Sequence, residues 1–81
     1  MEAEGLLGVK LVLEEGVLEL FSHGVSSMRL GSEAAERIER IPRKEGFAVS
    51  IRGRDRSALV AFSAEQAAQA EALLAAFEAA R

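Results

Sequence analysis

Side chains able to do chemistry are scarce in this sequence. His23 is its one histidine, Asp55 is its one aspartate, and cysteine is absent. Ser22, His23 and Asp55 have the residue types of a catalytic triad, but adjacent side chains on a strand point to opposite faces, so Ser22 and His23 are poorly placed to cooperate. A single histidine among scattered glutamates also lacks the repeated spacing of a zinc or calcium site. The sequence therefore predicts a protein that is not an enzyme and that uses no metal and no cofactor.

Basic residues gather in the middle of the chain. Residues 29–56 contain eight basic and five acidic side chains, a balance of +3, whereas the whole chain has a net charge of −3. Part of this group could converge at one end of a hairpin, or along its outward face, and bind a phosphate or an acidic partner. The candidate anion-binding residues are Arg43, Lys44, Arg52, Arg54 and Arg56. The alternative is a solvated hairpin tip at which Glu45 and Asp55 pair locally with the arginines.

Nucleic acid is an unlikely partner for these arginines. The acidic net charge opposes binding to a polyanion, and Phe21 is the only aromatic residue expected on an exposed strand face, so base stacking has no support. No apolar stretch approaches the length of a membrane span, and the chain opens with Met-Glu-Ala-Glu rather than with a basic signal segment. We expect a cytoplasmic protein that does not contact a membrane.

Residues 47–63 show the clearest pattern, that of a β-hairpin. The glycine, the aspartate and the charged residues between positions 53 and 56 suit a turn centred on Arg54 and Asp55. Because side chains alternate faces along a strand, that turn places six apolar residues on one face. The expected pairs are Ile51 with Ala58, Val49 with Val60, and Phe47 with Phe62.

Residues 64–80 are expected to form an amphipathic helix that packs on this hairpin. Ser63 can cap its start, and Gln66, three residues later, can complete a capping box. A stripe at helical spacing would face the sheet. Its members are Ala67, Ala70, Leu73, Leu74 and Phe77.

Residues 9–30 repeat the hairpin pattern and add a strand. A two-residue turn at Glu15 and Gly16 pairs Leu13 with Leu18 and Leu11 with Leu20. A break at His23-Gly24 then leads to a short strand over residues 25–30, with Met28 and Leu30 toward the core. Residues 1–8 are expected to be a flexible start.

Residues 32–43 permit two interpretations. Glu33 with Arg37 and Glu36 with Arg40 are correctly ordered pairs for a short helix that opens near Ser32 and ends before Pro42. Isoleucines and arginines also alternate over residues 38–44, which is typical of a strand. Sequence alone leaves the choice open.

The strand faces that point away from the helix are unusually apolar. They carry Val12, Val17, Phe21, Leu59 and Ala61. One domain of 81 residues has few residues left to cover a second face, so we expect a copy of the chain or another protein to cover it. A small closed barrel would instead bury some of these residues within the chain.

The fold class predicted is α+β: an antiparallel sheet of about four to six short strands in hairpins, packed by a C-terminal helix within one domain. The hairpin "GFAVSIRGRDRSALVAFS" followed by the helix "AEQAAQAEALLAAFEAA" resembles the small pleckstrin-homology-like domains of bacteria in the order of elements. The resemblance covers roughly residues 9 to 80 and implies a curled half-barrel, although the chain is short for the usual seven strands of the family. Lipid-binding members have basic residues in the first hairpin loop. Here that loop is Glu14-Glu15-Gly16, so the resemblance implies a protein-binding or oligomer-forming role.

Overall fold

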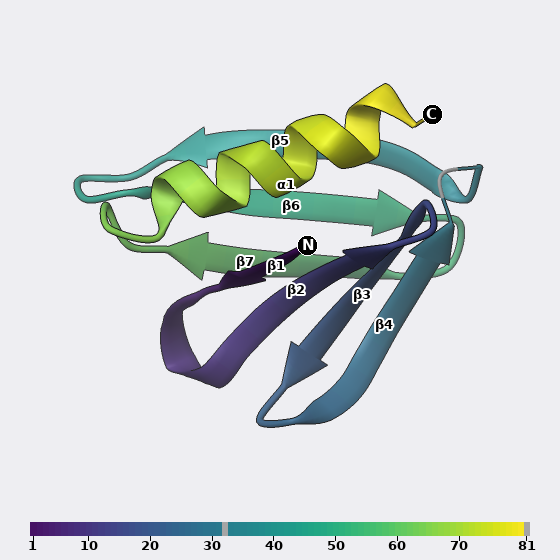
Figure 1. Cartoon of the computed structure of the whole chain (residues 1–81), viewed down its shortest axis with the longest axis horizontal. Helices are drawn as coiled ribbons and strands as arrows, with labels where there is room; N and C mark the ends of the chain where they lie inside the picture. Colours follow the sequence, from purple (N-terminus) through teal and green to yellow (C-terminus); the bar gives the residue numbers. More distant parts are fainter. Residues whose placement is uncertain (32, 81) are drawn as a thin grey trace.

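The computed structural model describes residues 1–31 and 33–80. These residues form two antiparallel sheets and a C-terminal helix, which confirms the α+β class (Figure 1). The first sheet has the order β1(Glu2–Glu4), β2(Val9–Glu14), β3(Val17–Ser22), β4(Val25–Gly31). The second has the order β5(Ala35–Pro42), β6(Phe47–Gly53), β7(Ser57–Phe62), and the helix is α1(Ala67–Ala79). Within the described residues, neither sheet closes into a barrel on its own.

The first sheet is a chain of hairpins with tight turns. The predicted pairs of Leu13 with Leu18 and Leu11 with Leu20 are present, and Met28 and Leu30 of β4 are buried as expected. The turns at Glu15-Gly16 and His23-Gly24 place both of their residues in the left-handed region, with φ between 51° and 80°. That geometry matches the right-handed twist of the flanking strands, which explains the short connections.

The second sheet contains the hairpin predicted for residues 47–63 in its expected register. Phe47 pairs with Phe62, and their rings stack with centroids 5.4 Å apart. Val49, Ile51 and Val60 on the same face are buried. The alternation of apolar side chains along these two strands was therefore enough to determine which face turns inward.

The ambiguous segment is a strand, so the short helix was the wrong interpretation. β5 pairs along its length with β6, and Ile38 lies opposite Ile51. A helix of about ten residues gains little stability alone, whereas pairing satisfies the backbone of β6 and adds Ile38 to the core. Ser32, where the helix was expected to open, lies outside the described residues.

The first eight residues contain two regular elements where a flexible start was expected. β1 pairs with β2, and Ala3 is buried at 1% exposure. A single 3-10 turn, η1(Leu6–Gly8), then connects β1 to β2. β1 gains its stability from this pairing and from its contact with α1, a long-range contribution that the short sequence of β1 does not reveal. With β1 and β5, the described strands number seven.

The C-terminal helix covers the inner side of both sheets. The capping box is formed, since the backbone N–H of Gln66 donates to Ser63 Oγ (3.2 Å) and the N–H of Ser63 donates to Gln66 Oε1 (2.9 Å). Residues 64–66 make a turn before the helix proper, so α1 begins at Ala67 rather than at position 64. The predicted stripe lies inward, with Ala70, Leu73, Leu74 and Phe77 all fully buried. These side chains join the two sheets into a single core.

Candidate functional site

The five apolar residues expected to form one outer face lie on two different surfaces. Val12, Val17 and Phe21 are on the outer side of the first sheet, whereas Leu59 and Ala61 are on the outer side of the second. The two hairpin units form separate sheets. An outward-facing residue of the first sheet therefore lies on a different side of the molecule from an outward-facing residue of the second. The sequence-based prediction of one shared interface therefore becomes two candidate surfaces.

The surface on the second sheet is an apolar groove of about 700 Å³, which we call the leucine groove. Leu59, from the middle of β7, is 67% exposed, and Ile41, from the end of β5, is 39% exposed. The turn η1 forms one wall and contributes Leu6 and Leu7. Among the described residues, Arg43 is the only charged member of the lining. The complete lining is Leu6, Leu7, Val9, Ile41, Arg43, Ala48, Leu59, Val60 and Ala61.

Leu7 has the least favourable environment of the residues in the groove. Its backbone is in the left-handed helical region, with φ 59° and ψ 37°, and its side chain is 88% exposed. A leucine in that conformation is destabilised by roughly 1–2 kcal/mol relative to the right-handed region. Glycine, asparagine and aspartate are the residues that such turn positions favour. Leu7 therefore combines backbone strain with an exposed apolar side chain.

The turn that presents Leu7 is held in place by its neighbours. The N–H of Gly5 donates to the carbonyl of Val9 (2.8 Å), and the N–H of His23 donates to the carbonyl of Gly8 (2.9 Å). A Cβ atom added to Gly5 would lie 2.8 Å from the carbonyl oxygen of Ala61, so only glycine permits this approach to β7. The groove wall is therefore built into the fold.

The surface on the first sheet is a hollow of about 660 Å³, which we call the acidic hollow. Val12 and Phe21 are half-buried in it, and its charged lining residues are four glutamates and one lysine. Lys10 pairs with Glu2 at 3.1 Å, and Ser26 Oγ donates to Glu19 Oε2 at 2.6 Å. The complete lining is Glu2, Glu4, Gly5, Gly8, Val9, Lys10, Val12, Glu14, Glu19, Phe21 and Gly24. Val17 lies on the same side of the sheet but outside this lining.

The five predicted anion-binding residues do not form one cluster. Arg43 and Lys44 lie in the connection before β6, whereas Arg52, Arg54 and Arg56 lie at the opposite end of that strand. The full length of β6 separates the two groups of basic residues, because a strand is extended. The prediction of one cluster overlooked this separation.

The second group of arginines lies beside β4. The guanidinium of Arg56 donates to the carbonyl of Ser27 at 3.5 Å, and Arg54 and Arg56 border a small hollow with Arg29. Arg52 lies opposite Arg37 on the outer face of the second sheet. This arrangement gives the outer face of the second sheet a basic end and an apolar end.

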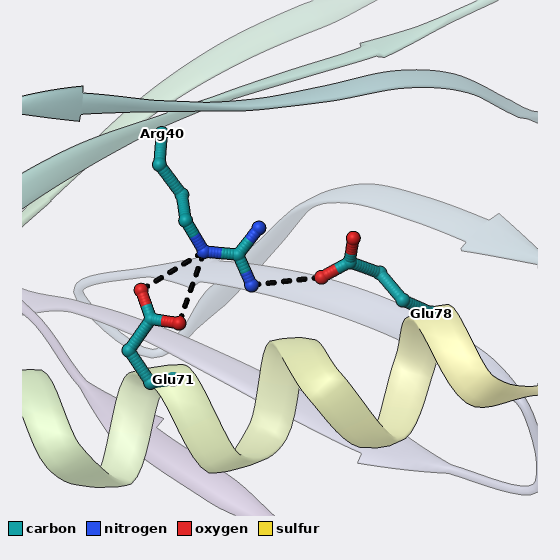
Figure 2. Close-up of polar contacts among 3 residues, drawn as sticks. All are labelled: Arg40, Glu71 and Glu78. Atoms are coloured by element: carbon teal, nitrogen blue, oxygen red, sulfur yellow. Dashed lines mark hydrogen bonds and ion pairs between the residues drawn. The ribbon is translucent and has the colours of Figure 1, made fainter.

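Arg40 makes contacts that the sequence analysis did not foresee. Its Nε donates to both carboxylate oxygens of Glu71, at 2.9 and 3.0 Å, and its Nη2 donates to Glu78 at 2.7 Å (Figure 2). Hydrogen bonding with Glu78, followed by that with Glu71, raises the pKa of the Arg40 guanidinium. Arg40 therefore joins the edge strand β5 to α1, and no local sequence pattern could signal a pair separated by more than 30 positions.

The candidate catalytic residues are not assembled. The ring of His23 lies against Gly8, while Asp55 is in the β6–β7 turn beside β4. Within residues 1–31 and 33–80, no group of three or more histidine, aspartate or glutamate side chains is arranged to hold a metal ion. In the same part of the chain, no helix is long and apolar enough to cross a membrane.

Leu6, Leu7 and Ile41 were not predicted from the sequence as members of a site. A signal was present, because Gly8, Gly16 and Gly24 recur at intervals of eight residues and each closes a tight turn. That spacing predicts a turn at Leu7-Gly8, and hence an exposed leucine.

No family model, curated protein or solved structure matches this chain.

Proposed function

We propose that this protein is a non-catalytic protein-interaction or self-assembling module that makes contact through the leucine groove. The observation that carries the proposal is Leu7, whose backbone is strained and whose side chain is exposed. Strained, exposed apolar residues occur where a function requires them, because stability alone would replace them. Docking of a partner would bury the Leu7 side chain, and the role of the strained turn would be to present this side chain to the partner.

The rest of the groove supports the same function. Leu59, Ile41 and Leu6 are exposed apolar residues that line the same groove as Leu7, and an exposed apolar patch of this kind marks interaction sites on small domains. Arg43 at the margin supplies a charged rim of the sort that surrounds an apolar interface core.

The proposal includes membership of the pleckstrin-homology-like domains and a cytoplasmic location. Four strands, then three strands, then a C-terminal helix give the strand number and order that the resemblance implies. The acidic loop at Glu14 and Glu15 supports a protein partner over a phosphoinositide.

The test compares groove variants with a matched surface variant. Leu7→Asn and Leu59→Ser change the groove. Val25→Ser is the surface control, because Val25 (68% exposed) is as exposed as Leu59 (67%) and lies outside the linings of both surfaces. Two assays would be run: light-scattering mass across concentrations, and affinity capture from extracts of the source cells with bound proteins identified by mass spectrometry. We expect self-association or capture of a specific protein with the parent chain and Val25→Ser, and loss with both groove variants. Equal behaviour of all four chains would overturn the proposal.

A further inference from the structure

We propose that the leucine groove binds the outer face of the first sheet of a second copy of this chain, the face that carries the acidic hollow, so that the copies associate head to tail. This inference rests on the proposed function, because it assigns a partner to the same groove. It goes further in naming a second, different surface on the same molecule as the complement.

The two sheet faces on which these sites lie carry opposite charge. The acidic hollow contains Glu2, Glu4, Glu14 and Glu19 against Lys10. The outer face of the second sheet contains Arg37 and Arg52, with Arg43 beside the groove, against Glu39. Complementary potentials of this kind select partners and orient them during encounter.

The charges left without a partner are complementary too. Lys10 with Glu2 and Arg37 with Glu39 (2.6 Å) are already paired within the chain. Among the described residues, Glu4 and Glu14 on one surface and Arg43 and Arg52 on the other make no ion pair within 4.0 Å. The charges left without an ion pair are therefore negative on the first face and positive on the second.

The apolar centres also match. Val12 lies between Glu2 and Glu19 in the pairing of the first sheet, so the acidic hollow has an apolar middle and a charged margin. Leu59 and Ile41 lie in the apolar end of the second surface, with arginines at its limits.

Charge disfavours a two-fold arrangement in which a surface meets its own copy. Such an arrangement would place the glutamates of two hollows together, or the arginines of two grooves together, and like charges in contact destabilise a complex. Pairing of unlike surfaces is heterologous and continues from copy to copy, either until a ring closes or as an open filament. Val9 borders both surfaces, so successive copies would join at an angle and the assembly would curve.

The test uses one blocking variant for each surface. Leu59→Glu places a negative charge in the groove, where it would meet the acidic hollow of the next copy. Phe21→Arg places a positive charge in the hollow, where it would meet the basic face. Glu4→Lys combined with Glu14→Lys changes only exposed side chains of the hollow, so it keeps the test valid should Phe21→Arg fail to fold. Ala75→Glu, on the exposed side of α1, is the control.

The expected results concern light-scattering mass at rising concentration and at low and high salt. The parent chain and Ala75→Glu should grow in mass with concentration and lose mass at high salt. Each blocking variant alone should remain a monomer. An equal mixture of Leu59→Glu with a hollow variant should give a species of twice the monomer mass and no larger, because the mixture holds one intact groove and one intact hollow.

The outcomes separate this inference from the proposed function. A parent chain that stays monomeric at every concentration overturns head-to-tail association, while capture of another protein through the groove would still support the proposed function. A parent chain that associates, with blocked variants that do not pair when mixed, also overturns it in favour of a two-fold interface. Formation of the mixed dimer, with neither variant associating alone, supports it.

Discussion

Leu7 is an apolar residue at a turn position that favours a small or polar one. Three tight turns in the first sheet end in glycine and have a non-glycine residue before it in the left-handed region: Leu7-Gly8, Glu15-Gly16 and His23-Gly24. Polar side chains at the latter two positions face water without an apolar penalty. Leucine at the first position has both the backbone strain and the unfavourable exposure.

Replacement of this leucine should therefore stabilise the protein. Asparagine tolerates the left-handed region, so we expect Leu7→Asn to raise the free energy of unfolding by about 1 kcal/mol. Urea denaturation followed by circular dichroism measures the change. Leu6→Asn is the control, since Leu6 has no positive φ and should gain no stability from relief of strain. A Leu7→Asn chain no more stable than the parent would refute the assignment of strain to this residue.

Gly46 is required by both conformation and space. Its φ is 76°, and a Cβ atom there would overlap the carbonyl oxygen of Phe62. Gly16 has nearly the same φ, 77°, but nothing within 4 Å of the added atom. We expect Gly16→Ala to lower stability by about 1 kcal/mol, and Gly46→Ala to lower it by at least about 3 kcal/mol because the backbone must also move. Similar thermal midpoints for the two variants would contradict this prediction.

Strand β5 shows where sequence-based interpretation reaches its limit. Its ion-pair spacing is typical of a helix, and its alternation is typical of a strand. The choice depends on β6, which offers a paired edge and an apolar partner for Ile38. Both hairpins, by contrast, were predicted to the residue, because their turn residues and their apolar pattern agree.

The inner face of β5 joins α1 through Arg40, and this link should contribute to stability. Arg40 holds two carboxylates and its side chain is 34% exposed, so we expect Arg40→Ala to lower the free energy of unfolding by about 1 kcal/mol. Arg37→Ala is the matched control. It breaks a more exposed pair on the outer face, with Glu39, and should change stability by less than about 0.5 kcal/mol. Chemical denaturation compares the two, and equal losses would indicate that the Arg40 contacts do not hold the helix to β5.

At the scale of the whole molecule, β1 joins the first sheet to the C-terminal helix, two elements that lie far apart in the sequence. It pairs with β2 and contacts α1, and Ala3 is buried between them. The short segment completes the core although its composition, Glu-Ala-Glu, has no strand signal of its own.

Introduction of charge at this junction should destabilise the entire fold. Ala3→Asp would bury a carboxylate without a partner, and we expect the free energy of unfolding to fall by at least about 3 kcal/mol. Glu4→Ala, on the adjacent exposed position, should change it by less than about 0.5 kcal/mol. Calorimetric midpoints for both variants test the prediction, and tolerance of Ala3→Asp would show that β1 is not part of the cooperative core.

The candidate site was predictable only in part, because its residues come together through the packing of the two sheets. Alternation along each strand correctly identified Val12, Phe21, Leu59 and Ala61 as facing away from the core. It could not reveal that the sheets form separate layers, which gives these residues two surfaces rather than one. The groove wall from η1 depends in addition on a close approach of Gly5 to β7, which is a property of the folded chain alone.

Gln66 connects two distant parts of this architecture. It completes the cap with Ser63, and its side-chain amide also donates to the carbonyl of Gly5 at 3.4 Å, next to the turn that carries Leu7. Surface loops usually tolerate insertions and deletions as proteins diverge. Here a change in the length of the η1 loop would displace Gly5 from Gln66 and disturb the beginning of α1. In descendants of this sequence, the length of that loop and the glutamine at position 66 should therefore be inherited together.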